Sequence, residues 1–315
     1  MGSRKPPLLH RRDAILAGIT DTDLRRDCHQ NNLVHIARGS YLPEPEYREL
    51  DVVDKHRARV VAAAHRHGET AVFSHISAAV LHGFDVWNAP LQAVHVTRTG
   101  ARPGRRGPNV HHHPTALEPA EIVEIDGLRV TSPARTITDL ARTLSLHSAV
   151  STGDHALRLG LAVGDLAASV ATATGRHGAA KARHALTLMD GRSESVGESL
   201  SRLLIREVGL PTPSLQRRVF GSGGESLGRV DFDFPGTAVV GEFDGKVKYG
   251  KYPKPGQDAS DVLYREKIRE DRIRDTGLVV VRWVWADLSR PLVLRSRIAE
   301  AFRRAHKWRG GPRTT

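Results

Sequence analysis

The chain has 315 residues, which is long for one domain and sufficient for two or three. Its net charge of +12 at pH 7 and its pI of about 10.3 favour a polyanionic partner, of which nucleic acid is the commonest. The single cysteine, Cys28, excludes an intramolecular disulfide and a zinc site built from several thiolates, and it fits a reducing compartment.

The distribution of apolar residues argues against a membrane partner. No long apolar run and no lysine-rich amphipathic helix stands out in the sequence. The stretch from Met1 to Asp13 is basic, contains Pro6 and Pro7, and lacks the apolar core of a signal peptide. We therefore expect a cytoplasmic protein that binds DNA and not a membrane.

The N-terminal part has the pattern of two short helices followed by a hairpin. One helix is predicted over Arg11–Ala17 and a second over Leu24–Asn31, with an N-cap offered by Thr20–Asp23. The alternation over Leu33–Leu42 predicts a hairpin with its turn at Arg38-Gly39. Helix, turn, helix and hairpin is the order of a winged helix, in which the second helix enters the major groove.

In a winged helix, polar side chains of the second helix and of the hairpin contact DNA. An alternative interpretation is a helical hairpin that packs on the next domain. The residues predicted to contact DNA are Arg25, Arg26, Gln30 and Arg38.

The middle part, residues 56–190, is predicted to be an α/β domain. Ser74 is expected to cap a short apolar helix that ends at Gly83. The other helices are predicted over His56–Gly68, Ala134–Leu144, His147–Arg158, Val163–Thr172 and Gly175–Leu188, and the strands over Leu91–Thr97, Val110–His113 and Leu128–Thr131.

Two pairs of histidines fall in this middle part. His75 and His82 share a helical face, and His111 and His113 share a strand face. A histidine on an apolar helix is more often buried and hydrogen-bonded than a metal ligand. His111 and His113 have no nearby cysteine and no evident third ligand. We therefore expect structural roles for these histidines.

Four motifs in the first 190 residues resemble the AbiEi-type antitoxins, the DNA-binding partners of type IV toxin–antitoxin systems. The resemblance implies an N-terminal winged helix that binds an operator, a larger regulatory domain, and a cognate toxin on another chain. The motifs are Arg-Gly-Ser-Tyr (38–41), Ser-His-Ile-Ser-Ala-Ala-Val-Leu-His-Gly (74–83), Val-His-Val-Thr (94–97) and Gly-Leu-Arg-Val-Thr-Ser-Pro-Ala-Arg-Thr-Ile-Thr-Asp-Leu-Ala (127–141).

The segment from Arg229 to Lys248 predicts two strands joined at Pro235-Gly236. In the first strand the apolar residues Val230, Phe232 and Phe234 alternate with acidic ones, so the two sets point to opposite faces. In the second strand Glu242 and Asp244 share a face. A turn centred on Pro235-Gly236 places Asp231 opposite Val240, so that Asp231, Glu242 and Asp244 converge.

Three carboxylates on one face raise the pKa of at least one of them unless a counter-charge is present. A divalent cation supplies that charge, and a set of oxygen ligands suits Mg²⁺ or Mn²⁺. Lys246 follows on the same side of the strand and is placed to orient or activate a water. The alternative is that the acidic residues form the solvated outer face of an edge hairpin.

The same segment resembles the restriction-endonuclease-like PD-(D/E)XK family, in its branch similar to the very short patch repair endonuclease. The resemblance rests on a helix over Glu194–Val208, then Val-Asp-Phe (230–232), Glu-Phe-Asp-Gly (242–245), a charged helix over Ser260–Thr276, and a strand over Leu278–Trp285. It implies a mixed sheet flanked by helices and metal-dependent cleavage of DNA.

The resemblance assigns roles to five residues. Asp231 and Glu242 would hold Mg²⁺, with Asp244 or Glu198 completing the set of ligands. Asp244 stands where the family usually has a lysine, so the lysine's role falls to Lys246, to another residue or to none. In the loop that follows, Lys248 and Lys251 are interleaved with Tyr249 and Tyr252, a pattern that suits a nucleic-acid backbone and exposed bases.

The sequence therefore predicts a multidomain protein of α+β and α/β type. Its expected parts are a winged helix (1–55), an α/β regulatory domain (56–190), an endonuclease-like domain with a mixed sheet (191–306) and a basic tail (307–315). The leading functional hypothesis is a metal-dependent DNA endonuclease. The alternative is a non-catalytic transcription regulator or antitoxin with a degenerate nuclease site.

Overall fold

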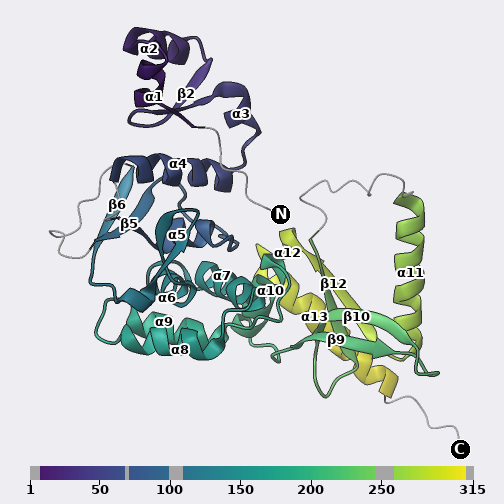
Figure 1. Ribbon diagram of the computed structural model, residues 1–315. Helices are drawn as coiled ribbons and strands as arrows, with labels where there is room; N and C mark the ends of the chain where they lie inside the picture. Colours follow the sequence, from purple (N-terminus) through teal and green to yellow (C-terminus); the bar gives the residue numbers. More distant parts are fainter. Residues whose placement is uncertain (1–7, 68–70, 99–108, 246–258, 310–315) are drawn as a thin grey trace, which may run out of the picture. The chain divides into compact units, whose positions relative to one another are not determined.

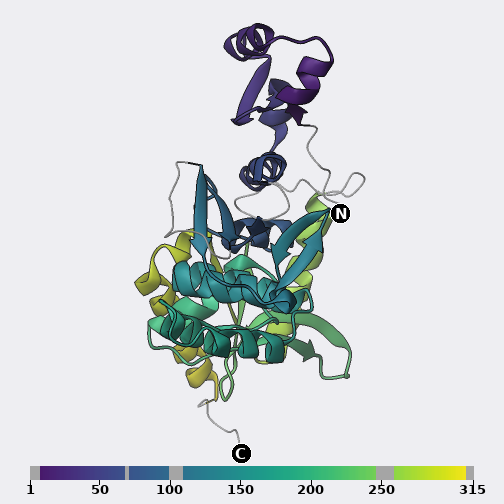
Figure 2. The same ribbon diagram turned by 60° about the vertical axis from the view of Figure 1, so that its left-hand side comes forward.

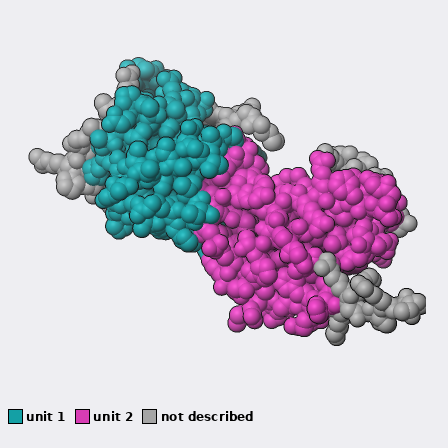
Figure 3. Space-filling model, turned by 90° about the horizontal axis from the view of Figure 1, so that it is seen from below, with its two compact units in different colours: residues 1–152, 160–187 teal, residues 153–159, 188–315 magenta. Residues whose placement is uncertain are grey.

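The computed structural model describes residues 8–67, 71–98, 109–245 and 259–309. The chain is a mixed α+β protein that divides into two compact units, coloured separately in Figure 3. The first unit consists of residues 1–152 and 160–187, and the second of residues 153–159 and 188–315. Among the helices that the structure describes, none is both long and apolar enough to cross a membrane.

The N-terminal elements of the first unit form a small sheet with the strand order β1-β3-β2 (Figure 1). Helix α2 begins at a capping box, in which the Thr20 side chain and the Asp23 carboxylate each accept a bond from the other's backbone N–H. Gly39, at φ 77°, makes the predicted turn between β2 and β3. The elements are β1 (Leu9–His10), α1 (Arg11–Leu16), α2 (Asp21–His29), β2 (Leu33–Ala37), β3 (Ser40–Pro43) and α3 (Glu44–Glu49).

The rest of the first unit is built around a mixed sheet with the strand order β6-β5-β4-β8-β7. Helices α4 and α5 pack on this sheet through a cluster that includes Val60, Ala78 and Val96. Its first elements are α4 (Val52–His67), β4 (Val72–Phe73), α5 (His75–Leu81), β5 (Val94–Arg98), β6 (Val110–Pro114), the 3₁₀ turn η1 (Pro119–Glu121), β7 (Ile122–Ile125) and β8 (Leu128–Thr131).

Four helices follow, and α6 packs against both α5 and α8. Figure 2 shows this group of teal helices from a second side. Helix α6 begins after Ser132, whose side chain accepts the Arg135 N–H and caps the helix. Inside it, the buried Arg135 guanidinium bonds the carboxylates of Asp139 and Glu121. The helices are α6 (Pro133–Thr143), α7 (Leu146–Arg158), α8 (Val163–Thr172) and α9 (Ala179–Leu188).

The second unit holds a sheet with the strand order β12-β11-β10-β9. Strands β9, β10 and β11 are antiparallel neighbours, and β12 runs parallel to β11. Strand β9 and the short helix α12 were not expected from the sequence. The elements are α10 (Val196–Glu207), β9 (Ser214–Phe220), β10 (Ser226–Asp233), β11 (Val239–Asp244), α11 (Ala259–Asp275), β12 (Val279–Val284), α12 (Trp285–Leu288) and α13 (Pro291–Arg309).

Both faces of this sheet are covered by helices. Trp283 and Phe232 lie in a cluster with residues of α10 and α13, and Val240 lies in a second cluster with Ile273 of α11. Gly241 faces the Trp283 ring so closely that a side chain there would collide with it. The indole N–H of Trp283, which is fully buried, donates to the Ser201 hydroxyl at 2.7 Å.

The predicted pairing of the central hairpin was wrong by two residues. Val240 pairs with Asp233 rather than with Asp231, because the loop is centred one residue later than expected and runs from Pro235 to Ala238. A shift of two residues preserves which residues share a face. Asp231 and Glu242 therefore keep their expected proximity, although the predicted partner of Asp231 changes.

The expected alternation of the first strand also fails at one position. Val230 packs in the α11 cluster with Val240, whereas Phe232 packs in the cluster with Trp283. An ideal strand would place Val230 and Phe232 on one face. The irregularity lies beside Gln216 of β9, whose backbone is in the left-handed region at φ 58°. The apolar residues on either side of Asp231 in β10 thus pack into different core clusters.

The basic tail predicted from residue 307 also needs correction, because α13 continues to Arg309. Residues 310–315 lie outside the described residues, as does the loop that carries Lys246, Lys248 and Lys251.

Candidate functional site

The predicted acidic residues of the second unit gather where β10, β11 and α10 approach one another. Asp231 is half-buried, and its Oδ2 accepts the backbone N–H of Phe243 at 2.8 Å. Burial, with added repulsion from Glu198, Glu242 and Glu194, raises the pKa of Asp231 to about 6. Asp231 is thus a carboxyl group that is partly protonated just below neutral pH.

Glu242 is the most completely paired carboxylate of this site. It is 9% exposed, and its Oε1 accepts Nη2 of Arg269 at 2.6 Å. Its Oε2 accepts Nε and Nη2 of Arg282 at 2.7 and 2.6 Å. Arg282 lies beside Glu242 on the parallel strand β12, and its Nη1 also contacts Glu270 of α11 at 2.8 Å. Two arginines therefore supply the counter-charge that the sequence analysis assigned to a cation.

Glu198 is held in the first turn of α10. Its Oε2 accepts the Glu194 N–H at 2.9 Å and the Gln216 side-chain amide at 2.7 Å, and its Oε1 accepts the Ser195 hydroxyl at 2.9 Å. Burial raises the pKa of this carboxyl as well. Glu198 is therefore both a helix-capping residue and one of the charges that act on Asp231.

Gly197 allows α10 to reach this position. A methyl group on Gly197 would overlap the ring of Phe243 in β11. The absence of a side chain thus brings the N-terminus of α10 against the strand that carries Glu242. The ring of Phe243 in turn contacts Trp285 edge-on, with ring centroids 5.3 Å apart.

Asp244 ends β11, where it pairs with Val284 of β12, and it is half-buried. The convergence expected for Asp231, Glu242 and Asp244 does not bring three ligand atoms to metal-binding distances. Within the described residues, the group with three ligating atoms inside 4.8 Å of one another consists instead of His75, His95 and His113. The acidic site is a carboxylate–arginine cluster, formed by Asp231, Glu242, Glu198, Arg269 and Arg282.

The arginines of this cluster were the part that sequence reasoning missed. Arg269 was predicted only as one of many charges on α11. Arg282 carried a usable signal, because it is a single charge within the apolar strand Val-Val-Val-Arg-Trp-Val of residues 279–284. A lone charge in a buried strand requires a partner, and Glu242 on the adjacent strand is that partner.

The four N-terminal residues predicted to contact DNA are all exposed. Arg25 and Arg26 lie on α2, Gln30 is the C-cap of that helix, and Arg38 precedes the turn at Gly39. Arg26 forms an ion pair with Asp23 at 2.7 Å. Lys248 and Lys251, also predicted to contact nucleic acid, lie outside the described residues, as does Lys246.

Comparison with known proteins gives a family but no function. No protein-family model matches the chain. The uncharacterized proteins MT2308 and Rv2248, from two strains of Mycobacterium tuberculosis, are each 34% identical to it over 231 residues, which are 73% of this chain and 80% of theirs. The chain belongs to the family of these two proteins. A crystal structure of the RV2827C protein from Mycobacterium tuberculosis covers 69% of this chain and 84% of its own, with 15% identity and a TM-score of 0.38.

The close approach of α10 to β11 predicts an unusual response to a helix-favouring substitution. Gly197→Ala should lower the free energy of unfolding by about 1–3 kcal/mol, because the added methyl group meets the Phe243 ring. Gly164→Ala is the matched control. Gly164 lies in α8 with nothing near its missing side chain, so alanine should stabilise by up to about 1 kcal/mol. Chemical denaturation measures both, and equal stabilisation by the two variants would contradict the contact.

The raised pKa of Asp231 predicts a specific dependence of stability on pH. Between pH 3.8 and about 6 the folded state keeps a proton that the unfolded chain has lost, so this contribution to stability disappears as pH rises through that window. Asp231→Asn removes the effect, and its stability relative to wild type should increase by up to about 3 kcal/mol between about pH 4 and pH 8.

Denaturation at the two pH values measures this change, with Asp275→Asn, exposed at the end of α11, as control. A ¹³C titration of the Asp231 carboxyl group gives its midpoint directly. A midpoint at or below the ordinary value of 3.8 would contradict the structure at this site.

Proposed function

We propose that this protein binds DNA and that its second unit hydrolyses phosphodiester bonds with the help of Mg²⁺ or Mn²⁺. The order of elements supports the proposal: a helix, three antiparallel strands, a helix and a strand parallel to the third. Apart from the additional strand β9, this is the order expected from the resemblance to the restriction-endonuclease-like family. Asp231 and Glu242 stand on adjacent strands, as that resemblance requires.

The observation that carries the proposal is the raised pKa of Asp231. Burial among Glu198 and Glu242 makes ionisation of Asp231 unfavourable, and a bound divalent cation reverses that cost. Groups whose pKa is shifted by burial and by a specific neighbour are concentrated at functional sites. Among the described residues, Oδ1 of Asp231 accepts no hydrogen bond, so it is available as an oxygen ligand.

The donor set fits a hard cation once Glu242 exchanges its partners. Both Glu242 oxygens are bonded to arginine, so a cation must displace at least one of Arg269 and Arg282. An arginine displaced from Glu242 remains beside the site and can bond a phosphate with two parallel N–H groups. Each arginine would then alternate between two partners, the Glu242 carboxylate and the phosphate of the substrate.

When bound, the metal ion would polarise the phosphate and make a coordinated water more acidic. The residues of the chain do the rest of the work. Asp231 and Glu242 would hold the cation. Arg269 and Arg282 would stabilise the charge that develops on the phosphate. The negative potential of the buried Glu198 would favour cation binding. On its sequence position alone, Lys246 is proposed to take the role of the family's lysine.

Incubation of the purified protein with supercoiled plasmid and Mg²⁺ or Mn²⁺ tests the proposal. Wild type and Asp275→Asn should convert the plasmid to nicked or linear forms, whereas Asp231→Asn and Glu242→Gln should lose at least about 100-fold in rate, as groups that stabilise charge in a transition state do. Mg²⁺ should also lower the titration midpoint of the Asp231 carboxyl group. Equal, metal-independent cleavage by wild type and both site variants would rule out this site.

A second candidate function is a non-catalytic DNA-binding regulator or antitoxin. Two observations favour it: the arginines already neutralise Glu242, and Asp244 stands where the nuclease family has a lysine. The N-terminal unit then supplies the activity through the exposed Arg25, Arg26, Gln30 and Arg38. The motifs similar to AbiEi-type antitoxins add a cognate toxin as a possible partner.

Binding to the DNA upstream of its own gene, without metal, tests this second function. Arg25→Ala/Arg26→Ala should weaken binding at every salt concentration and reduce the slope of log affinity against log salt by about 1 for each lost phosphate contact. Arg12→Ala, exposed on α1, is the matched control and should retain the wild-type slope. Wild-type binding by the double variant would exclude α2 as the DNA-contacting helix.

A further inference from the structure

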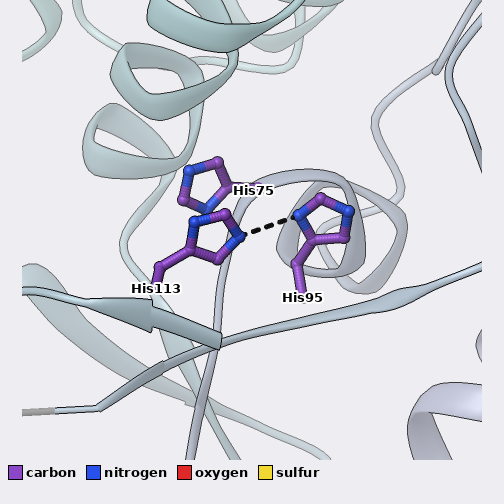
Figure 4. A group of neighbouring side chains, drawn as sticks. All are labelled: His75, His95 and His113. Atoms are coloured by element: carbon purple, nitrogen blue, oxygen red, sulfur yellow. Dashed lines mark hydrogen bonds between the residues drawn. The ribbon is translucent and has the colours of Figure 1, made fainter. Parts of the chain in front are cut away.

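Histidines from three elements of the first unit meet at one point, as Figure 4 shows. His75 is the first residue of α5, His95 lies in β5, and His113 lies in β6. The rings of His75 and His113 are stacked with centroids 3.7 Å apart, and Nδ1 of His95 lies 3.0 Å from Nε2 of His113. One ring nitrogen from each of the three lies within 4.8 Å of the others. We call these residues the histidine triad.

We propose that the histidine triad binds one divalent transition-metal ion, with Zn²⁺ as the best match. Imidazole nitrogen is a preferred ligand of Zn²⁺, and three histidines with one open position form a common zinc site. Zn–N bonds of about 2.0–2.1 Å require ligand nitrogens about 3.3 Å apart in a tetrahedron. Because the rings of His75 and His113 are stacked, at least one of them must rotate before both can direct a nitrogen at a shared ion. The site is separate from the carboxylate–arginine cluster and does not depend on it.

The triad is in the chemical form that binds metal. His75 and His95 are 5% and 8% exposed, and burial lowers the pKa of each well below its usual range. The neighbouring imidazoles of the group lower these pKa values further, so that both rings are neutral at physiological pH. A neutral imidazole is the ligand form of histidine. Within the described residues, Nε2 of His95 has no hydrogen-bond partner, and it lies on the side of the ring that faces away from His113 (Figure 4).

Other polar groups hold the triad in position. The Ser74 hydroxyl contacts Nδ1 of His75 at 3.0 Å and accepts Thr97 Oγ1 at 2.8 Å. The Ser77 hydroxyl accepts the backbone N–H of His95 at 2.9 Å. The Ser74 contact is of the kind that fixes the ring orientation of a metal-ligating histidine, whereas the Ser77 bond holds the backbone of β5. Ser74 stands at the N-cap of α5 as predicted, but its side chain makes no cap hydrogen bond and contacts His75 and Thr97 instead.

The backbone at His75 is strained. Its φ of 52° lies in the left-handed region, which costs about 1–3 kcal/mol for a residue with a side chain and recurs at functional sites. This conformation begins the fully buried helix α5 and directs the imidazole toward His113. A helix that serves only packing could begin in an unstrained backbone conformation. The strained conformation at His75 therefore supports a functional role for the position of its imidazole ring.

An open coordination position has space beside it. A cavity of about 430 Å³ is lined by all three members of the triad, by His111 and His112, and by Thr143. The volume accommodates a water molecule or a small anion as the fourth ligand. His111 and His113 were expected to have structural roles, and the structure places His113 in the triad and His111 at the cavity wall.

Metal uptake by protein prepared without a histidine tag tests the proposal. After removal of metal with EDTA, wild type should take up one equivalent of Zn²⁺, and Co²⁺ should give the visible absorption of a tetrahedral site. Zn²⁺ should also raise the melting temperature, because it binds the folded state. His95→Gln and His113→Gln should lower metal affinity at least about 100-fold, the upper end of what loss of a supporting outer group costs. His184→Gln, exposed on α9, should bind as wild type does.

A second measurement does not require the variants to fold. In wild type, Zn²⁺ should slow the modification of the peptide carrying His113 by diethylpyrocarbonate and leave that of His184 unchanged. Absence of uptake by wild type at micromolar Zn²⁺ would overturn the proposal, as would unchanged affinity in both triad variants. Loss of uptake in Asp231→Asn/Glu242→Gln, with uptake retained in the triad variants, would move the metal to the carboxylate–arginine cluster and also overturn it.

Discussion

The contact of Glu242 with Arg269 and Arg282 is the interaction on which the second unit depends. Glu242 lies on a strand covered by helices on both faces, where an unpaired carboxylate would cost several kcal/mol. The two guanidinium groups come from α11 and β12, so one carboxylate ties the helix and the parallel strand to the centre of the sheet. Removing both arginines would leave the buried Glu242 carboxylate without a counter-charge in a low-dielectric environment.

The need to neutralise buried charge is met differently at each site of this protein. Glu242 takes arginines, Asp231 holds its proton to a higher pH, and Asp139 in the first unit is paired with Arg135 inside α6. The buried rings of His75 and His95 remain uncharged. A metal ion can bind a buried residue that stays neutral. A metal ion or a phosphate can also replace the counter-charge of a buried charged residue. The two proposed sites are thus the places where buried ionisable groups either lack a counter-charge or can exchange it for another.

The two proposed metal sites differ in the chemistry of their ligands. The carboxylate–arginine cluster offers hard oxygen atoms and suits Mg²⁺ or Mn²⁺. The histidine triad offers imidazole nitrogen and suits Zn²⁺. Because each site lies within one compact unit, each can be altered without changing the ligands of the other. The family shared with two uncharacterized mycobacterial proteins extends over most of the chain, so relatives of this protein can be used to examine both units.

The sequence by itself determined much of the local structure and the shared face of Asp231 and Glu242, but not the face of Val230. Hydrophobic periodicity, the Thr20 cap and the Gly39 turn each predicted elements that are present. The proximity of Asp231 and Glu242 survived a two-residue error in register, because side chains in a strand alternate with a period of two. Only the tertiary structure decided what neutralises Glu242, since its partners lie 27 and 40 residues away. The histidine triad is likewise assembled from three separate segments. Periodicity specifies which way a side chain points, but the packing of distant elements determines what it meets.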